Sequence, residues 1–352
     1  MNNADKKNEL NNILGELSRY KNIDQMPSFR IVEVLKKHIK KIPKFLYKYY
    51  PCESNRMKAV SNCKIWASRG NTFEANDALL EFDKRKLLKY VYNEKELFLI
   101  DFARKDYNIS EDTVNYYRRK CIDGNYRVNK QAENELLLKH PNTELSFLIQ
   151  YLRYLRKEYS LASQYREQLN AIKYGARNST DILCLTETNC NKSMWEQYAD
   201  NYNGFCVEYS FENPYLDETQ MRNLVSLNGV VYEDKIQFDP ILLFPRLKVD
   251  KKIVGDDNIY LNAQLYYKKK KFSFEREWRI VFHPNRNDRE INPNGNLYDF
   301  PFINKIYIGY RMDSTYKNEL IQIAKNLFIP AEEITYDQNA QKHSYKVLTQ
   351  MI

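Results

Sequence analysis

Two glutamates two positions apart, Glu275 and Glu277, precede an apolar segment that runs from Trp278 to Phe282. In an extended strand, residues two positions apart point to the same face, so both carboxylates are expected to project from one side. Carboxylates placed together in this way can carry enzymatic chemistry. Glu277 is the first candidate for a catalytic role because it lies nearer the apolar body of the strand. The alternative is a solvated pair of acids with a cross-strand ion pair to Arg279.

A second stretch whose residues could take part in ligand binding runs from Ser193 to Tyr198 and is flanked by two strand candidates. Trp195, Tyr198 and Ala199 are three and four positions apart, which places them on one side of a short helical turn. Aromatic rings in that position can pack into a core or stack on a flat ligand. Core packing is the commoner use of such residues, and stacking is the functional alternative.

Composition limits the kinds of site that these residues can form. The chain has 352 residues and 9 glycines, no two of them close in sequence. This scarcity excludes the Gly-rich dinucleotide fingerprint and the phosphate loop. The 4 histidines are not at metal-ligand spacing from one another, which argues against a zinc site or a His-based triad. Any enzymatic chemistry is therefore expected to rest on carboxylates and hydroxyls, without a metal.

The net charge of +9 is unevenly distributed. Lysines are frequent from Lys36 to Lys48, and an unbroken basic run leads into the two glutamates. The members of this run are predicted to bind nucleic-acid phosphates, with a solvated surface as the alternative: Lys268, Lys269, Lys270 and Lys271. The 6 cysteines form no Cys-x-x-Cys pair, and no apolar run reaches membrane-spanning length. We expect a cytoplasmic protein with reduced thiols and no membrane partner.

The elements that must position these residues fall into three predicted parts. Residues 1–42 are expected to form N-terminal helices, residues 43–77 with 178–340 an α+β core, and residues 78–177 a large helical insertion. Strands are predicted at Phe45–Tyr50, Cys63–Ser68, Ile182–Thr186, Phe205–Tyr209, Val230–Tyr232, Trp278–Phe282, Lys305–Gly309 and Glu333–Tyr336. Helices are predicted at Glu9–Arg19, Phe29–Ile39, Glu94–Ala103, Ser110–Lys120, Asn129–Lys139, from about Thr143 onward and at Ser314–Phe328, with a loop and a short helix at Pro240–Asp257.

Three blocks of sequence motifs carry a resemblance to a known family. They are Ile65-Trp66-Ala67-Ser68 with Phe73-x-x-Asn76-Asp77, then Cys184-Leu185-Thr186 with Met194-Trp195-x-x-Tyr198-Ala199, and finally Glu275-x-Glu277-Trp278-Arg279. Together they resemble the bacterial domain-of-unknown-function family 2971 over roughly Phe45–Tyr336. The chain departs from that family's pattern at Ala78, where proline is usual, and at Thr186, where serine is common.

Members of that family resemble distant relatives of the ADP-ribosyltransferase superfamily, and their genes often sit among anti-phage systems. The resemblance implies a split, mostly antiparallel sheet that binds NAD without a Gly-rich loop. Its signature would fall on an early strand, on the middle aromatic platform and on the late strand with the glutamates. The residues implied to bind NAD are Tyr47, Lys48, Tyr49, Ser193, Trp195, Tyr198 and Arg279, and those implied to be catalytic are Glu277 and Glu275.

The expected function is transfer of ADP-ribose from NAD, used as a substrate, to a protein or to RNA or DNA. The protein would act as a bacterial anti-phage defence or toxin-type protein, with a partner protein from a defence operon. One alternative is a non-enzymatic sensor of nucleic acid or nucleotides. The other is a carboxylate-dependent nuclease, in which Glu275, Glu277 and Asp77 would hold a metal.

Overall fold

The chain divides into two compact units. Unit 1 consists of Met1–Leu79, Tyr174–Ile236 and Asp256–Ile352, and unit 2 consists of Leu80–Lys173 and Gln237–Gly255. The structure, a computed structural model, describes residues 2–17, 26–73, 77, 79–82, 99–100, 103–104, 107–123, 127–158, 177–212, 216–238 and 264–349.

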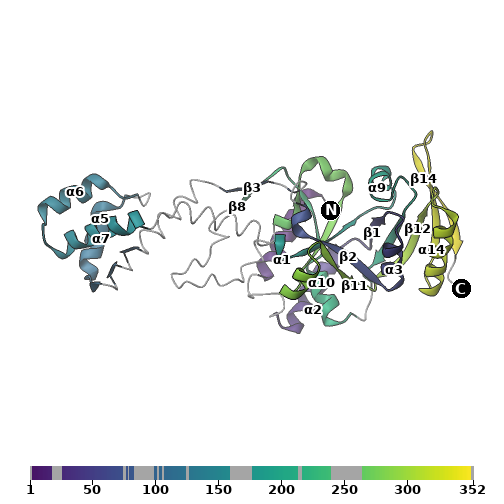
Figure 1. The fold of residues 1–352 in the computed structure, drawn as a ribbon, viewed down its shortest axis with the longest axis horizontal. Coiled ribbons are helices and arrows are strands. Elements are labelled where there is room, and N and C mark those ends of the chain that lie inside the picture. Colours follow the sequence, from purple (N-terminus) through teal and green to yellow (C-terminus); the bar gives the residue numbers. More distant parts are fainter. Residues whose placement is uncertain are drawn as a thin grey trace. The chain divides into compact units, whose positions relative to one another are not determined.

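A ten-stranded sheet forms the centre of unit 1 (Figure 1). Its main path runs in the order β11 (Gly295–Asp299), β2 (Lys64–Arg69), β4 (Asp181–Thr186), β1 (Phe45–Tyr50), β5 (Phe205–Ser210), β12 (Ile303–Gly309), β13 (Ala331–Asp337) and β14 (Lys342–Thr349). β10 (Glu277–Phe282) pairs with β4 and with β6 (Asn228–Gly229). Within the described residues, the strand pairs of this sheet are antiparallel except β12 with β13. The prediction of an α+β protein with a mostly antiparallel sheet is confirmed.

β4 shares one of its edges between two partner strands. Its other edge pairs with β10 along the whole length, from Thr186 opposite Glu277 to Asp181 opposite Phe282. On the shared edge, β1 pairs with β4 at Thr186, whereas β2 pairs with it at the opposite end, at Asp181 and Ile182. Because β10 occupies one edge of β4, both β1 and β2 must pair with the other edge, each at a different end. The two strands therefore diverge along the middle of β4. This divergence opens the sheet between them.

Most of the predicted strands occur within a residue or two of their expected ends. The longer strands β11 and β14 and the short strands β6, β8 (Lys235–Phe238) and β9 (Tyr267–Lys268) were not predicted. β14 has the sequence Lys-His-Ser-Tyr-Lys-Val-Leu-Thr, and most of its side chains are exposed. It is held by backbone pairing with β13 rather than by an apolar face. Strands of this kind carry a weak sequence pattern, because hydrophobic periodicity reports burial and not backbone pairing.

Helices and short strands surround the sheet of unit 1. The described α-helices of this unit are α1 (Asn3–Leu17), α2 (Ser28–His38), α3 (Ser54–Ser61), α9 (Lys192–Tyr198), α10 (Glu218–Val225), α13 (Arg286–Ile291) and α14 (Ser314–Asn326). The strand β7 (Val231–Tyr232) pairs in parallel with β9 (Tyr267–Lys268). In α1, the side chain of Asn3 accepts a hydrogen bond from the backbone N–H of Tyr232 at 2.8 Å and donates to its carbonyl at 3.3 Å. The N-terminal helix thereby closes the edge of β7.

A strained turn connects α9 to β5. Asp200, Asn201 and Tyr202 all have left-handed backbone conformations, with φ of 46°, 51° and 67°. The turn places the ring of Tyr202 parallel to that of Trp195, with centroids 5.3 Å apart. Gly204 lies two residues after Tyr202. A Cβ added there would lie 2.1 Å from the carbonyl oxygen of Tyr50, so only glycine fits.

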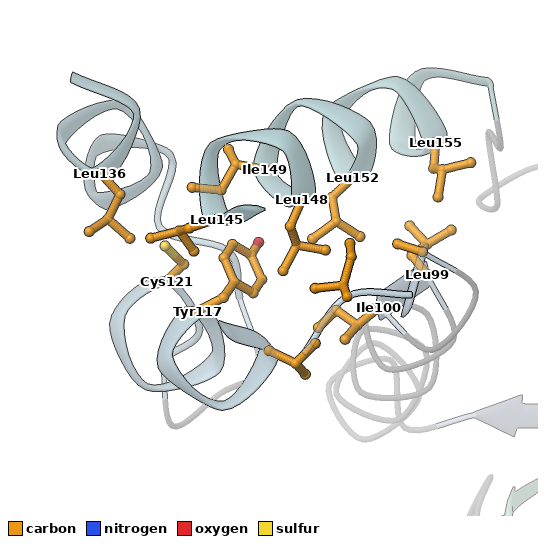
Figure 2. Packing of buried hydrophobic residues seen from close by; sticks show 13 residues of the cluster. Leu99, Ile100, Tyr117, Cys121, Leu136, Leu145, Leu148, Ile149, Leu152 and Leu155 are labelled. Carbon is orange, nitrogen blue, oxygen red and sulfur yellow. The ribbon is translucent and has the colours of Figure 1, made fainter. Parts of the chain in front are cut away.

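Unit 2 has a hydrophobic core of its own. Its described helices are α5 (Glu111–Cys121), α6 (Lys130–Lys139) and α7 (Glu144–Glu158). Leucine and isoleucine side chains of α7 point toward α5 and α6 in Figure 2, and Leu148, Ile149 and Leu152 are fully buried. A buried polar group lies among these helices: Glu133 accepts a hydrogen bond from the Tyr117 hydroxyl at 2.7 Å.

One part of the predicted helical insertion is wrong. The helical insertion was expected to begin at residue 78, but Leu79–Phe82 forms the strand β3, which pairs with β8 (Lys235–Phe238) in a two-stranded sheet. Segments as short as this take their conformation from a distant partner, which local periodicity cannot reveal. Most of the predicted helix Glu94–Ala103 and all of Pro240–Asp257 lie outside the described residues. Among the helices that the structure describes, none has both the length and the apolar character of a membrane span.

Candidate functional site

The opening between β1 and β2 forms a pocket of about 270 Å³. Its lining includes Tyr47, Lys48 and Tyr49 from β1, Ser68 from β2, Thr72 and Phe73 after β2, Ile182, Cys184, Leu185 and Thr186 from β4, Met194 and Tyr198 from α9, and Lys268, Glu275 and Glu277. Within the opening, the ammonium of Lys48 donates a hydrogen bond to the backbone carbonyl of Cys184 at 3.3 Å. The divergence of two strands therefore produces both the cavity and an unpaired stretch of backbone in its wall.

The two glutamates meet at a single buried lysine. The ammonium of Lys268 lies 2.9 Å from Oε2 of Glu277 and also pairs with Oε2 of Glu275. All three residues are at most 4 % exposed. A lysine between two carboxylates neutralises only part of their charge, so the cluster needs further cations to be stable in a buried position.

Those cations come from two arginines behind the pocket. Nε of Arg279 donates to Oε1 of Glu277 at 2.7 Å, and its Nη2 donates to Asp77 at 3.0 Å. Arg177 donates to the other oxygen of Asp77 at 2.7 Å. Acids and bases therefore alternate along a chain of six side chains: Glu275, Lys268, Glu277, Arg279, Asp77 and Arg177. Such a chain keeps buried charges paired.

Glu275 reaches this cluster by a route that differs from the predicted one. It ends the short 3-10 helix η5 (Lys270–Glu275), and Arg276 then adopts a left-handed conformation with φ of 45° before β10 begins at Glu277. The two glutamates thus converge through a backbone turn, not through the alternation of a strand. The backbone is fixed on both sides, because the Thr186 hydroxyl donates to the Glu275 carbonyl at 2.6 Å and the Glu277 N–H donates to the Tyr232 hydroxyl at 2.7 Å.

The two carboxyl groups have opposite pKa shifts. Burial favours the protonated form of Glu277, but the charges of Arg279 and Lys268 outweigh burial and lower its pKa to about 2. For Glu275, burial raises the pKa above its ordinary value, and the nearby charge of Glu277 adds to this rise while Lys268 opposes it. One carboxyl is therefore a permanent anion, and the other is better suited to exchange a proton.

Tyrosines form the aromatic part of the pocket wall. The hydroxyl of Tyr198 donates to Oε1 of Glu275 at 3.1 Å, and the side chain is 40 % exposed. Tyr47 and Tyr49 face the pocket from β1. Burial raises the pKa of Tyr198 and of Tyr47, so both phenols stay protonated and can donate hydrogen bonds.

Residues 194–280 match the family model described as "Protein of unknown function (DUF2971)". The match runs from α9 into β10 and includes Tyr198, Lys268 and both glutamates of the site. It covers less than half of the chain, and part of the sequence resemblance is thereby borne out. No match was found among curated proteins or among solved structures.

The structure brings together seven of the predicted site residues. Those that line the pocket are Tyr47, Lys48, Tyr49, Tyr198, Lys268, Glu275 and Glu277. Arg279 lies behind them and is fully buried in its ion pairs with Glu277 and Asp77. It holds a site residue in place, and its guanidinium is not presented to a dinucleotide pyrophosphate. Ser193 does not line the pocket.

Trp195 is a core residue in this structure and does not line the pocket. Its side chain is 0 % exposed, and it packs edge-on against Tyr49 at 5.2 Å and parallel to Tyr202. Its indole N–H donates to the carbonyl of Asn189 at 2.7 Å. Trp195 and Tyr198 are three residues apart on α9, but of these two aromatic residues only Tyr198 lines the pocket.

The basic run that follows Tyr267 does not form one phosphate-binding surface. Lys268 is only 4 % exposed and belongs to the ion-pair cluster. The backbone N–H of Lys270 donates to Asp234 at 3.1 Å, and the ammonium of Lys271 lies 4.9 Å from the Phe272 ring centroid. Lys269 precedes the helix η5. The role of the run as a nucleic-acid guide stays a prediction for its three later members.

The sequence alone did not predict the role that several residues have in the site. Asp77 was considered for chemistry only as a metal ligand, Cys184 and Tyr232 were noted only within a family motif and a predicted strand, and Arg177 was not named. Arg177 is 100 positions from its partner Asp77, and Arg279 is 202 positions from it. An isolated charge next to a strand carries no sequence signal of a partner that far away.

The described residues do not contain a group of three or more His, Cys, Asp or Glu side chains arranged to hold a metal ion. Both carboxylate oxygens of Asp77 accept hydrogen bonds from arginines, and the residue is 1 % exposed. Divalent cations in proteins are held by converging oxygen ligands. The geometry therefore gives the nuclease alternative less support than chemistry carried by the two glutamates themselves.

Proposed function

We propose that the pocket receives the nicotinamide–ribose end of NAD and that the protein transfers ADP-ribose to a protein or nucleic-acid acceptor. In this scheme the bond between ribose C1′ and the nicotinamide nitrogen breaks, neutral nicotinamide leaves, and the acceptor nucleophile bonds to C1′. The proton of the nucleophile passes to Glu275. A toxin-type role in bacterial defence is the biological setting that the sequence resemblance suggests.

The proposal is supported most directly by the opposite pKa shifts of two adjacent buried glutamates in one pocket. Glu277 stays ionised and can stabilise the oxocarbenium-like sugar through a ribose hydroxyl. Glu275 has the raised pKa that suits a group which accepts a proton in one step and returns it later. The hydrogen bond from Tyr198 fixes the orientation of that carboxyl.

The shape of the pocket is compatible with the reactive half of a dinucleotide. A volume of about 270 Å³ lies near the lower limit for small-molecule sites, so the remainder of NAD would extend beyond it. Tyr47, Tyr49 and Tyr198 offer rings against which a flat pyridine ring can stack. No Gly-rich loop is needed for this mode of binding.

Release of nicotinamide from NAD by the full-length protein tests the proposal. Glu275→Gln should reduce the rate by about 100-fold or more, the size of a lost general acid or base. Tyr198→Phe should reduce it by about tenfold, because the phenol no longer orients the carboxyl.

A matched control is Glu133→Gln in unit 2, since Glu133 is also a buried glutamate with a tyrosine hydroxyl and basic partners. This variant should release nicotinamide at the wild-type rate. Equal rates in wild type and Glu275→Gln, with both proteins folded, would reject the catalytic assignment. Activity should also survive a chelator; cleavage of nucleic acid that stops with chelator would favour a nuclease instead.

A nucleotide sensor without catalysis is the second candidate, and one observation favours it. If all six side chains of the ion-pair chain are charged, its three acids and three bases balance one another, so no carboxylate is left uncompensated. Calorimetry with NAD separates the two candidates. Binding without release of nicotinamide, in the presence of bacterial lysate as a source of acceptors, would favour the sensor.

A further inference from the structure

Unit 2 carries a row of aromatic side chains at the edge of its core, in which Tyr151 packs against the core and the other three rings are exposed. Phe147, Tyr151 and Tyr154 lie four and three positions apart along α7, and Tyr107 joins them from the segment before α5. Tyr107 is 51 % exposed, Phe147 42 % and Tyr154 56 %. Exposed aromatic side chains in such a cluster are uncommon on a surface without a binding role.

The core of unit 2 is formed by another side of the same helix. Leu145, Leu148, Ile149, Leu152 and Leu155 of α7 point inward, and they are at most 8 % exposed (Figure 2). These residues follow the spacing of a complete apolar stripe. Phe147 and Tyr154 are therefore additional to the stripe that folds the unit, and Tyr151 joins them to the core.

The rings of the row hold one another in a fixed arrangement. Phe147 and Tyr151 are within 11° of parallel with centroids 6.2 Å apart, and Tyr151 and Tyr154 are within 21° of parallel at 6.1 Å. Tyr107 packs edge-on at 4.7 Å from both Phe147 and Tyr151. A row that is ordered before binding loses little conformational entropy when a ligand stacks on it.

Cations accompany the rings. The side chain of Arg104, three residues before Tyr107, is 47 % exposed, and its contact with Glu111 is a long one of 3.9 Å. Lys157 is exposed one turn after Tyr154. Over the whole of unit 2, Lys and Arg outnumber Asp and Glu by 22 to 16. Stacking rings with nearby cations are the combination that binds single-stranded nucleic acid, through base stacking and attraction of phosphates.

We infer that this aromatic row, Tyr107, Phe147, Tyr151 and Tyr154, is a binding surface for the unpaired bases of single-stranded RNA or DNA. The inference does not depend on NAD chemistry in unit 1. Every base has a flat face, so little sequence preference is expected. Duplexes, whose bases are already stacked, should bind more weakly than single strands.

Fluorescence anisotropy of a labelled single strand of about 20 nucleotides, titrated with the full-length protein, tests this inference. Phe147→Ala and Tyr154→Ala should each weaken binding by about 5- to 100-fold, the range expected for the loss of one stacked base. Tyr154→Phe keeps the ring and should bind like the wild type. Leu138→Ala is the matched control, because Leu138 is an apolar side chain of unit 2 with 82 % exposure that lies on α6.

Three results would overturn the inference: no binding of the single strand, binding that the alanine variants do not weaken, or equal binding of a duplex of the same length. Equal binding of single strand and duplex would reduce the interaction to phosphate attraction. If the single strand does not bind, the aromatic row would instead be a candidate surface for a protein partner. Circular dichroism of each variant distinguishes a lost contact from a lost fold, and nicotinamide release reports separately on unit 1.

Discussion

Glu275 and Glu277 are the same residue type with the same near neighbour, yet their surroundings differ. Glu277 accepts hydrogen bonds from both Arg279 and Lys268, whereas Glu275 has Lys268 and the neutral hydroxyl of Tyr198. One additional cation is enough to separate the pKa values of two buried carboxyls. This difference at single residues is what allows separate roles in the proposed reaction.

The pH dependence of stability should report this difference. The pKa of Glu277 falls from 4.5 to about 2 on folding, so its contribution is fully present above about pH 4.5 and is lost as the pH falls toward 2. A shift of this size corresponds to about 3 kcal/mol. Glu277→Gln should therefore lower the free energy of unfolding near neutral pH and flatten its decline below pH 4.5.

Urea denaturation of wild type and variant at a series of pH values provides the measurement. Glu275→Gln is the contrast, because the raised pKa of Glu275 gives a contribution that is present at low pH and is lost as the pH rises through the folded value. The two variants should thus change the pH profile in opposite senses. If the unfolding free energy of both variants follows pH in parallel with that of the wild type, the opposite pKa shifts of Glu275 and Glu277 are wrong.

At the scale of elements, the short helix α9 divides its aromatic residues between core and pocket. Trp195 lies beneath the helix against Tyr49 and Tyr202, whereas Tyr198 lies at the pocket. The left-handed turn that follows α9 brings Tyr202 back under Trp195 and lets β5 start at Phe205. The helix therefore fixes one wall of the pocket through its buried side.

Trp195→Ala should destabilise unit 1 by about 3–5 kcal/mol, the usual cost of removing a buried aromatic ring. Tyr198→Ala, three residues later on the same helix, should cost much less, because Tyr198 is 40 % exposed. Thermal denaturation followed by tryptophan fluorescence and circular dichroism gives both values. A small effect of Trp195→Ala on stability, together with weaker NAD binding, would mean that the ring of Trp195 contacts the ligand.

At the scale of the whole molecule, two cores serve two different surfaces. The sheet of unit 1 contains the pocket, and the helices of unit 2 carry the aromatic row. A unit with its own hydrophobic core can unfold by itself, so one two-state transition is not expected for the full chain.

Leu148→Ala tests this independence, because Leu148 is fully buried in the core of unit 2. The substitution should destabilise that unit by about 2–5 kcal/mol. Hydrogen exchange measured by mass spectrometry should then show lower protection in α5, α6 and α7 and unchanged protection in β4 and β10. Loss of protection in both units would mean that they unfold together.

The sequence by itself determined the elements that have a strong local pattern. Phe45–Tyr50 was predicted as a strand from its alternating pattern, and the prediction of Ile182–Thr186 lies within β4. The helix α14 was predicted from the spacing of Leu320, Ile323 and Ala324, which are buried. The two glutamates were recognised because two acids before an apolar strand are conspicuous. These features depend on neighbours in the chain, which a sequence displays directly.

Only the tertiary structure decided what surrounds those residues. The divergence of β1 and β2 along β4, the pairing of Asp77 with Arg177 and Arg279, and the burial of Lys268 all involve partners far apart in sequence. Local sequence likewise could not tell that Trp195 is covered while Tyr198 is open. Burial and ion pairing are set by which segments the fold brings together, and a pKa shift follows from them, so neither can be derived from residue type and spacing.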